Sequence, residues 1–268
     1  MTDAATLPFE PYEPQPRRRR RVWPWIVTLV IVFGLLGAAA FGAESLARGA
    51  VTGGIRTLIV SQLGLPADQA VDVEVAGIVI PQLISGTLDD VTVASDDVSF
   101  GELSGDVRVN ITDMPIRADA AAGPGTAVVR LDETQLRALL STVDGFPADA
   151  AGIAAPDVTV SSELNLFGVG IPVGIALLPA ASEGGALTLA PSSFTAAGAE
   201  ITADGLRQQF GGLADTVLRT WDVCVAQYLP AALTLTSVDV EGAEVVAGFD
   251  IDGAVVVDST LRQNGTCG

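Results

Sequence analysis

The chain has 268 residues, with 14 Lys+Arg against 32 Asp+Glu and a formal net charge of −18. Every basic residue is an arginine and the sequence contains no histidine. These absences exclude Ser-His-Asp and Cys-His catalysis, lysine Schiff bases, the phosphate-binding lysine of a P-loop and histidine-ligated zinc.

The N-terminal segment has the pattern of a cytoplasmic tail. Residues 1–16 contain four prolines among polar residues, which predicts disorder. Arg17–Arg21 follow as an unbroken basic run, and few basic residues lie soon after the next segment. By the positive-inside rule, we expect residues 1–21 to be a disordered tail on the cytoplasmic side.

An apolar stretch without any charged residue runs over residues 22–43. Its 22 residues would extend about 33 Å as a helix, which matches the hydrocarbon core of a bilayer. Trp23 and Trp25 stand at its start, where interfacial indoles are common. A single transmembrane helix is therefore predicted over 22–43, with residues 44–268 outside the cytoplasm.

This helix can be a permanent signal anchor or a cleaved signal peptide. Ala38-Ala39-Ala40 offers a cleavage pattern of small residues. The apolar run is longer than a usual signal h-region, however, and the tail before it is long. We expect an uncleaved anchor in the cell membrane, and both alternatives export residues 44–268.

The exported part is strongly acidic. Asp3, Glu10 and Glu13 are the only acids before residue 22, which leaves 29 acids and nine arginines in residues 44–268 and a formal charge of −20. Such a surface disfavours nucleic acid as a partner. Membrane association is expected to come from the anchor and not from a basic face.

Cys224 and Cys267 are the only cysteines, and both lie in the exported part. An oxidising compartment favours a disulfide between them. The alternatives are a metal-binding pair or a reactive thiol. The disulfide would tie the C-terminus to the end of a helix.

The first half of the exported part predicts one helix followed by strands. Val51, Ile55, Leu58 and Ile59 recur at helical spacing within a helix over 44–63. Apolar and polar residues then alternate in strands, and a capping-box pattern predicts a short helix after them. The strands are expected at 71–75, 91–93, 107–111 and 127–131, and the capping box at 132–135.

The second half predicts further strands and a longer helix. A Val/Ile/Leu stretch covers 158–178, with weaker strands at 187–189 and 199–202. Apolar residues spaced by three and four then predict an amphipathic helix from Leu206 to Tyr228, ended by Pro230. Hairpin strands follow, over 233–240, 244–251 and 254–261.

These elements predict an α+β fold in which a curved antiparallel sheet wraps around one or two long amphipathic helices, preceded by a transmembrane helix. Strands with one apolar and one polar face support this arrangement. A slot lined by small branched aliphatics could hold an acyl chain, whereas the alternative is an ordinary packed core.

Three features together resemble a known family. They are the N-terminal membrane segment with the helix after it, the run Gly86–Val93 (GTLDDVTV), and the run Cys224–Pro230 (CVAQYLP) followed by a Val-rich hairpin and Cys267. In this order they are similar to the LmeA-type, actinobacterial lipid-binding envelope proteins. The resemblance covers about residues 44–268.

The resemblance implies a fold and a function. The family resembles tubular lipid-binding proteins, in which a curved sheet around a long helix leaves an apolar slot. Its members are tied to phospholipid binding and, in mycobacteria, to the maturation of mannan-bearing envelope lipids. We expect a phospholipid or glycolipid partner, with contacts from two predicted elements: Val169, Ile171, Val173, Ile175, Leu206, Phe210, Leu213 and Val217.

Acidic pairs are the remaining chemical candidates. Asp89-Asp90 and Asp96-Asp97 could bind calcium or act as an acid–base pair, but in so acidic a chain solvated turns are expected. Asp250-x-Asp252 lacks the rest of a calcium loop. We therefore expect no catalytic residue, no metal, no cofactor and no enzymatic activity. A packed envelope adaptor and a carboxylate-based hydrolase are the alternatives to lipid binding.

Overall fold

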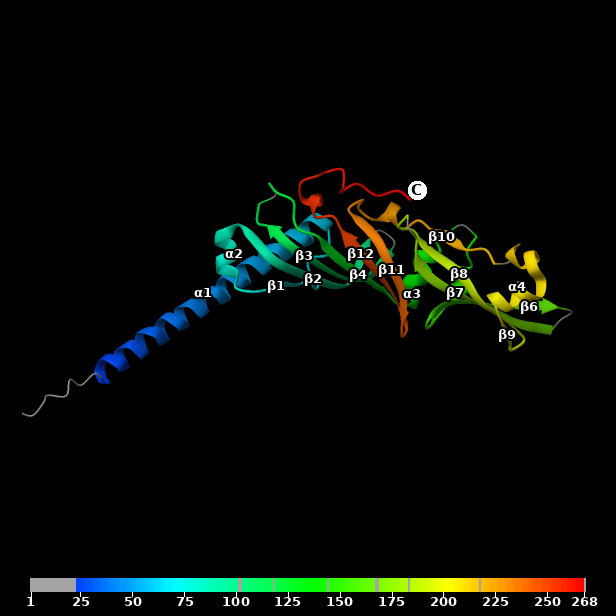
Figure 1. Cartoon of the computed structure of the whole chain (residues 1–268), viewed down its shortest axis with the longest axis horizontal. Coiled ribbons are helices and arrows are strands. Elements are labelled where there is room, and N and C mark those ends of the chain that lie inside the picture. Colours follow the sequence, from blue (N-terminus) through cyan, green and yellow to red (C-terminus); the bar gives the residue numbers. More distant parts are fainter. Residues whose placement is uncertain are drawn as a thin grey trace, which may run out of the picture. The chain divides into compact units, whose positions relative to one another are not determined.

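Helices and antiparallel strands follow one another along the chain, which confirms the α+β class (Figure 1). The computed structural model describes residues 23–100, 103–117, 119–143, 145–166, 169–182, 184–216 and 218–267. The tail predicted over 1–21 lies outside the described residues. The chain divides into two compact units, Met1–Ser45 and Leu46–Gly268.

The first helix is continuous across that division. Helix α1 extends over Trp23–Leu63 and so contains both the predicted span and the predicted helix over 44–63. Its part Val27–Ser61 is long and apolar enough to cross a membrane, and the most apolar window of that part is wholly exposed. The helix ends at Gly64, whose φ of +64° is a backbone conformation that glycine adopts without strain.

The strands form two six-stranded antiparallel sheets in place of the single sheet expected. The first sheet has the order β1-β2-β3-β4-β12-β11. Its strands are β1 (Asp72–Val75), β2 (Thr87–Phe100), β3 (Leu103–Pro115), β4 (Gly125–Leu131), β12 (Glu244–Ile251) and β11 (Leu233–Glu241). The short helix α2 (Val79–Ser85) connects β1 to β2.

The second sheet has the order β10-β8-β7-β6-β5, and β9 also pairs with β8. Its strands are β5 (Ala151–Ala154), β6 (Asp157–Leu166), β7 (Val169–Ala181), β8 (Leu187–Ala196), β9 (Ala199–Thr202) and β10 (Trp221–Val223). The apolar stretch 158–178 thus forms the β6–β7 hairpin. The expected strand over 254–261 is not formed, because Gly253–Val256 is a 3₁₀ turn.

The prediction of one helix from Leu206 to Tyr228 is wrong. Helix α4 covers only Ala203–Phe210 and ends at Gly211, which has a φ of +59°. Two consecutive glycines make further helix costly, and a 3₁₀ turn follows. Trp221–Val223 then gains the hydrogen bonds of a strand by pairing with Leu187–Leu189 of β8. The regularly spaced apolar residues between Leu206 and Tyr228 therefore belong to several short elements and not to one helix.

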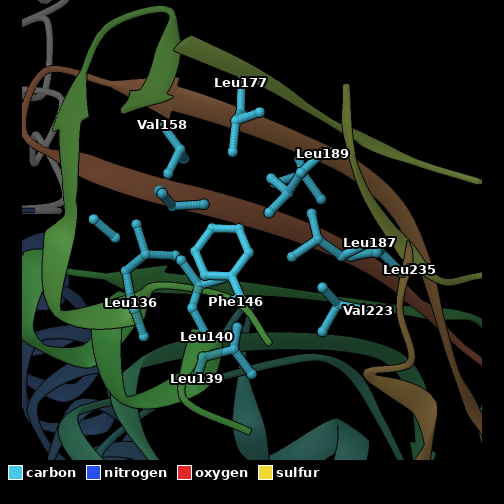
Figure 2. Packing of buried hydrophobic residues seen from close by; sticks show 14 of the residues in the cluster. Leu136, Leu139, Leu140, Phe146, Val158, Leu177, Leu187, Leu189, Val223 and Leu235 are labelled. Atoms are coloured by element: carbon cyan, nitrogen blue, oxygen red, sulfur yellow. The ribbon is translucent and has the colours of Figure 1, made fainter. Parts of the chain in front are cut away.

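The main hydrophobic core joins the two sheets. Helix α3 (Glu133–Leu140) inserts Leu136, Leu139 and Leu140 into it, and Leu140 is fully buried. Figure 2 shows Phe146 between these leucines and side chains from the second sheet, among them Leu177. Residues of β4, β11 and β12 from the first sheet complete the cluster.

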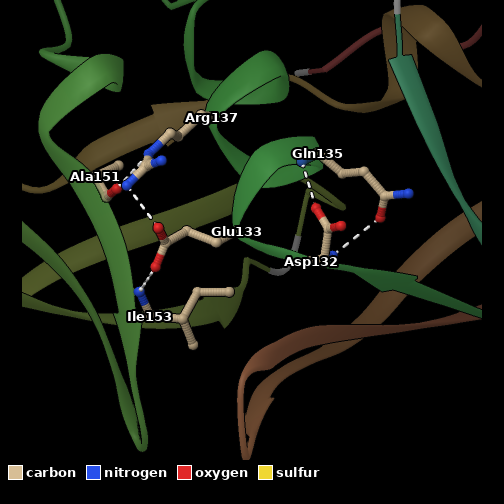
Figure 3. A network of polar contacts seen from close by, with 6 residues as sticks. All are labelled: Asp132, Glu133, Gln135, Arg137, Ala151 and Ile153. Atoms are coloured by element: carbon tan, nitrogen blue, oxygen red, sulfur yellow. Dashed lines mark hydrogen bonds and ion pairs between the residues drawn. The ribbon is translucent and has the colours of Figure 1, made fainter.

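Polar contacts cap the start of α3 and tie the helix to β5 of the second sheet, as Figure 3 shows. The predicted capping box is confirmed: Gln135 N–H donates to Asp132 Oδ1 at 2.7 Å, and Asp132 N–H donates to Gln135 Oε1 at 2.9 Å. Arg137 Nε donates to the carbonyl of Ala151 in β5 at 2.7 Å and pairs with Glu133 at 2.6 Å. Since Asp132 directly follows β4, the helix connects the first sheet to the edge of the second.

The disulfide between Cys224 and Cys267 is confirmed, with a Cα–Cα distance of 5.7 Å. Cys224 directly follows β10 and does not lie at the end of a long helix, contrary to expectation. The C-terminal segment also runs beside the residues before β11. There the N–H of Gly265 donates to the carbonyl of Leu229 at 2.9 Å.

Candidate functional site

A cavity of about 580 Å³ lies between the second half of α1 and one face of the first sheet. All of its described wall residues belong to the unit Leu46–Gly268. Ser95 is the one residue among them with a polar side chain, and the others are aliphatic residues, a methionine, a proline and a glycine. The site is therefore a dry groove suited to apolar groups.

One wall is a stripe along α1. Residues three and four apart lie on the same face of a helix, so the apolar pattern of this segment produces a continuous strip. Val51 and Ile55 also pack against a small cluster that contains Val75, Val79 and Leu88. The strip consists of Ala50, Val51, Gly54, Ile55, Leu58 and Ile59.

The opposite wall comes from the β2–β3 hairpin. Successive side chains of a strand point to opposite faces, so every second residue reaches the cavity. The antiparallel register pairs Val91 with Ile111 and Val93 with Val109. These four side chains form the middle of the wall, and Ser95 is paired with Val107 at its far side.

Two irregularities extend this wall beyond what strict alternation allows. Asp97 has a φ of +51°, and a register shift between Ser95 and Val98 brings Val98 onto the cavity side. Asp113 has a φ of +46°. Met114 after it lines the cavity together with Ile111, although residues three apart on a regular strand point to opposite faces. Aspartate enters this left-handed region more readily than most residues, which suits it to both positions.

The polar groups near the cavity are engaged elsewhere. The hydroxyl of Ser95 donates to the carbonyl of Ala70 at 2.7 Å and accepts from Gln69 Nε2 at 3.0 Å. It is therefore satisfied by the loop after α1 and offers little to a ligand. The cavity can hold an apolar chain, but its described wall residues include no acid, base or charged group for chemistry.

Two arginines fasten α1 to the segment that follows it. Arg48 Nη1 donates to the carbonyl of Val75 and its Nη2 to the carbonyl of Gly77, the latter at 2.6 Å. Arg56 Nη2 donates to the carbonyl of Gln69 at 3.0 Å. These bonds hold the helix beside β1 without filling the space between the helix and the hairpin β2–β3.

A second hollow of about 410 Å³ lies beside β1 and is polar. Arg48, Thr52, Glu74, Asp90 and Thr92 contribute to its walls. Asp90 accepts a hydrogen bond from Asn110 Nδ2 at 2.8 Å. The acidic pairs expected in turns thus lie along β2, and in the described ranges no group of three or more His, Cys, Asp or Glu could hold a metal.

The residues expected to contact lipid are not among the described walls of the larger cavity. Val169, Ile171, Val173 and Ile175 lie on β7 in the second sheet, and the side chains of the last three are half-buried. Ile175 packs against the main core. Lipid contact at these positions stays a prediction.

Three of the four positions predicted further along the chain lie on α4 and in the 3₁₀ turn that follows it. Leu206 on α4 is half-buried against Ala203 and Ala214, whereas Phe210 and Leu213 are exposed. Val217 lies outside the described residues. The sequence did contain the signal for the cavity, namely the apolar spacing in 44–63 and the alternation in 91–93 and 107–111.

The comparison with protein families gives one match. A family model described as LmeA-like phospholipid-binding matches residues 42–249. No curated protein and no solved structure matches the chain. The matched range includes the α1 strip, the hairpin β2–β3 and both sheets except for the last two residues of β12.

Proposed function

The chain belongs to the LmeA-like phospholipid-binding family, and from this premise we propose that the cavity beside α1 holds an acyl chain of a phospholipid. The observation that carries the proposal is the composition of the walls, in which a single hydroxyl stands among aliphatic side chains. Acyl chains need such a surface because they gain nothing from polar groups and lose their contact with water.

The size of the cavity supports this occupant. Its volume of about 580 Å³ lies within the roughly 300–1,000 Å³ of typical ligand pockets. Wall residues occur on β2 from Leu88 to Val98, a length of roughly 30 Å for a strand. One leaflet of a bilayer has a hydrocarbon depth of about 15 Å, so an extended acyl chain fits along this wall.

The expected affinity comes from burial of methylene groups. Each buried methylene contributes about 0.8 kcal/mol, so ten of them contribute about 8 kcal/mol before the cost of ordering the lipid. Because the described wall residues carry no charge, binding should change little with salt. A glycolipid with the same acyl chains would make the same contacts with the wall residues.

We propose further that the protein is anchored in the cell membrane by residues 22–43. Residues 1–21 would then be cytoplasmic and residues 44–268 an extracytoplasmic lipid-binding domain. The apolar length of α1 and the disulfide support this topology. The family is described by binding and not by a reaction, which fits a non-enzymatic role in carrying or transferring envelope lipid.

A packed envelope adaptor is the alternative function. Its sheets would have to be filled by side chains, as the main core around Leu140 and Leu177 is. The cavity beside α1 favours lipid binding over this alternative. Ser95, the one polar side chain among the described wall residues, donates its hydroxyl hydrogen to Ala70, which gives no support to a hydrolase.

Photo-cross-linking of the full chain tests the proposal. The protein is reconstituted in vesicles that contain a phospholipid with a diazirine on its acyl chain, and cross-linked peptides are identified by mass spectrometry. Cross-links on β2 and β3 are expected in addition to those on residues 22–43. Cross-links confined to residues 22–43 would contradict binding in the cavity.

Two neighbouring glycines supply matched variants. A Cβ on Gly54 or on Gly53 would meet nothing within 4 Å, but only Gly54 lines the cavity. Gly54→Phe should displace two or three methylenes, costing about 2 kcal/mol or roughly a 30-fold loss of cavity cross-links. Gly53→Phe should leave them unchanged. Both replace a helical glycine, so neither should destabilise α1.

A further inference from the structure

Helix α2 is unusual for a helix in water because it buries a glutamine and exposes an isoleucine. Its inward face buries Val79 together with Gln82, which is 5% exposed. Outward, Ile84 is 83% exposed, and Ile78 just before the helix is 64% exposed. A surface helix normally directs its apolar residues to the core and its amide side chains to solvent.

The buried glutamine is held in place by hydrogen bonds. Gln82 Nε2 donates to the carbonyl of Ala76 at 2.7 Å, and its Oε1 accepts from the N–H of Asp89 at 3.1 Å. The side chain thus connects the segment before α2 with the strand after it. These bonds fix the rotation of α2 about its axis and keep the side chain of Ile84 directed outward.

Four exposed apolar residues lie on α2 or on the segments next to it, and two of them line the cavity. We call Ile78, Leu83, Ile84 and Ile116 the α2 patch. The N–H of Ile116 donates to the carbonyl of Gly86 at 3.0 Å, which places Ile116 beside the end of α2. Leu83 and Ile116 also line the cavity, so the patch is continuous with the cavity wall.

This end of the domain lies close in the chain to the proposed anchor. Arg48, which donates to Gly77 next to the patch, follows Ala43 by five residues, and five residues span at most about 18 Å in any conformation. The headgroup layer of a bilayer is about 5–7 Å thick on each side. The exposed Arg117 directly follows the patch and could reach lipid phosphates, as basic side chains at interfaces do.

We propose that the α2 patch inserts into the outer leaflet of the membrane that carries α1, and that acyl chains pass from that leaflet into the cavity beside Leu83 and Ile116. This rests on the proposed function. The occupant of the patch is the bilayer itself, because the span, the patch and the cavity wall follow one another within a short length of chain.

Spin labels test insertion independently of lipid binding in the cavity. The two native cysteines form a disulfide, so one introduced cysteine is the single free thiol of the full chain. Ile78→Cys and Ile84→Cys are labelled and reconstituted in vesicles of phosphatidylcholine with phosphatidylglycerol. Leu178→Cys is the matched control, since Leu178 is an exposed leucine on β7 in the second sheet.

Collisions with oxygen and with a water-soluble nickel complex report the depth of each label. Labels at 78 and 84 should collide more with oxygen and less with nickel, whereas the label at 178 should remain aqueous. Aqueous labels at all three positions would overturn the proposal. A label at 84 shielded from both reagents would indicate a protein partner on the patch and would overturn it equally.

Ile84→Asp tests the path of the lipid. Cross-linking to β2 and β3 from diazirine phospholipid in vesicles should slow by about tenfold or more, because a charge replaces an inserted isoleucine. The same lipid offered in detergent micelles should load at the wild-type rate, and Leu178→Asp should be normal with both. If Ile84→Asp loads from vesicles at the wild-type rate, the proposed path from the leaflet past α2 into the cavity is overturned. A wild-type protein that loads from neither source would instead refute the proposed function.

Discussion

Removing the disulfide should destabilise the unit Leu46–Gly268 by about 4 kcal/mol. The bond joins residues separated by 43 positions, and the chain-entropy relation for a loop of that length gives about 4 kcal/mol at 25 °C. The loop contains β11 and β12, so the constraint acts on two strands of the first sheet as well as on the segment after β10. The variant to make is Cys224→Ala with Cys267→Ala.

Urea unfolding of the full chain in micelles measures this loss. The wild type is compared with the double variant, both with and without reductant. Reductant should lower the midpoint of the wild type toward that of the variant and should leave the variant unchanged. A difference in unfolding free energy below about 1 kcal/mol would refute the reasoning, as would a variant that still responds to reductant.

Three further predictions concern stability and titration. Leu140→Ala removes a fully buried side chain from the core and should cost about 2–5 kcal/mol by urea unfolding, whereas a cost under 1 kcal/mol would mean that the core is not packed as described. Asp132→Ala removes the α3 cap and should lower the free energy of unfolding by about 1 kcal/mol, whereas Asp132→Asn should keep most of the wild-type stability. Hydrogen bonds from the hydroxyl and the N–H of Thr260 hold the pKa of Asp258 below its ordinary 3.8, so Thr260→Val should raise that pKa in an NMR titration. A lowered pKa stabilises the folded state at pH values above the unfolded pKa, and this effect is lost as the pH falls through the folded pKa, so the variant should be less stable than wild type at neutral pH and should converge with it in acid.

Local signals in the sequence were sufficient for several elements. The capping box at Asp132 and Gln135 specifies the start of α3, because both side chains bond to nearby backbone. Alternating valines specify the hairpin β2–β3 in the same way. The helix expected from Leu206 failed because Gly211 and Gly212 outweigh a regular apolar spacing, and because β8 offers Trp221–Val223 a strand partner.

The position of the cavity could not be read from local signals. Both 44–63 and the segment from Leu206 have apolar spacing typical of a helix that a sheet covers. Which helix faces which strands depends on contacts between distant residues, such as Val51 and Leu88. The inward rotation of Gln82 is equally non-local, since it depends on bonds to Ala76 and Asp89.

Asp97, at the register shift in β2, limits how the hairpin β2–β3 can diverge between relatives. Exchanges among aliphatic residues at Val91 or Val109 would alter the width of the cavity and leave its path along the hairpin unchanged. Loss of one residue at Asp97 would instead remove the register shift, restore strict alternation beyond it and turn Val98 toward water. The shape of the cavity can therefore drift by substitution in this hairpin, whereas insertions and deletions near Asp97 should be rare.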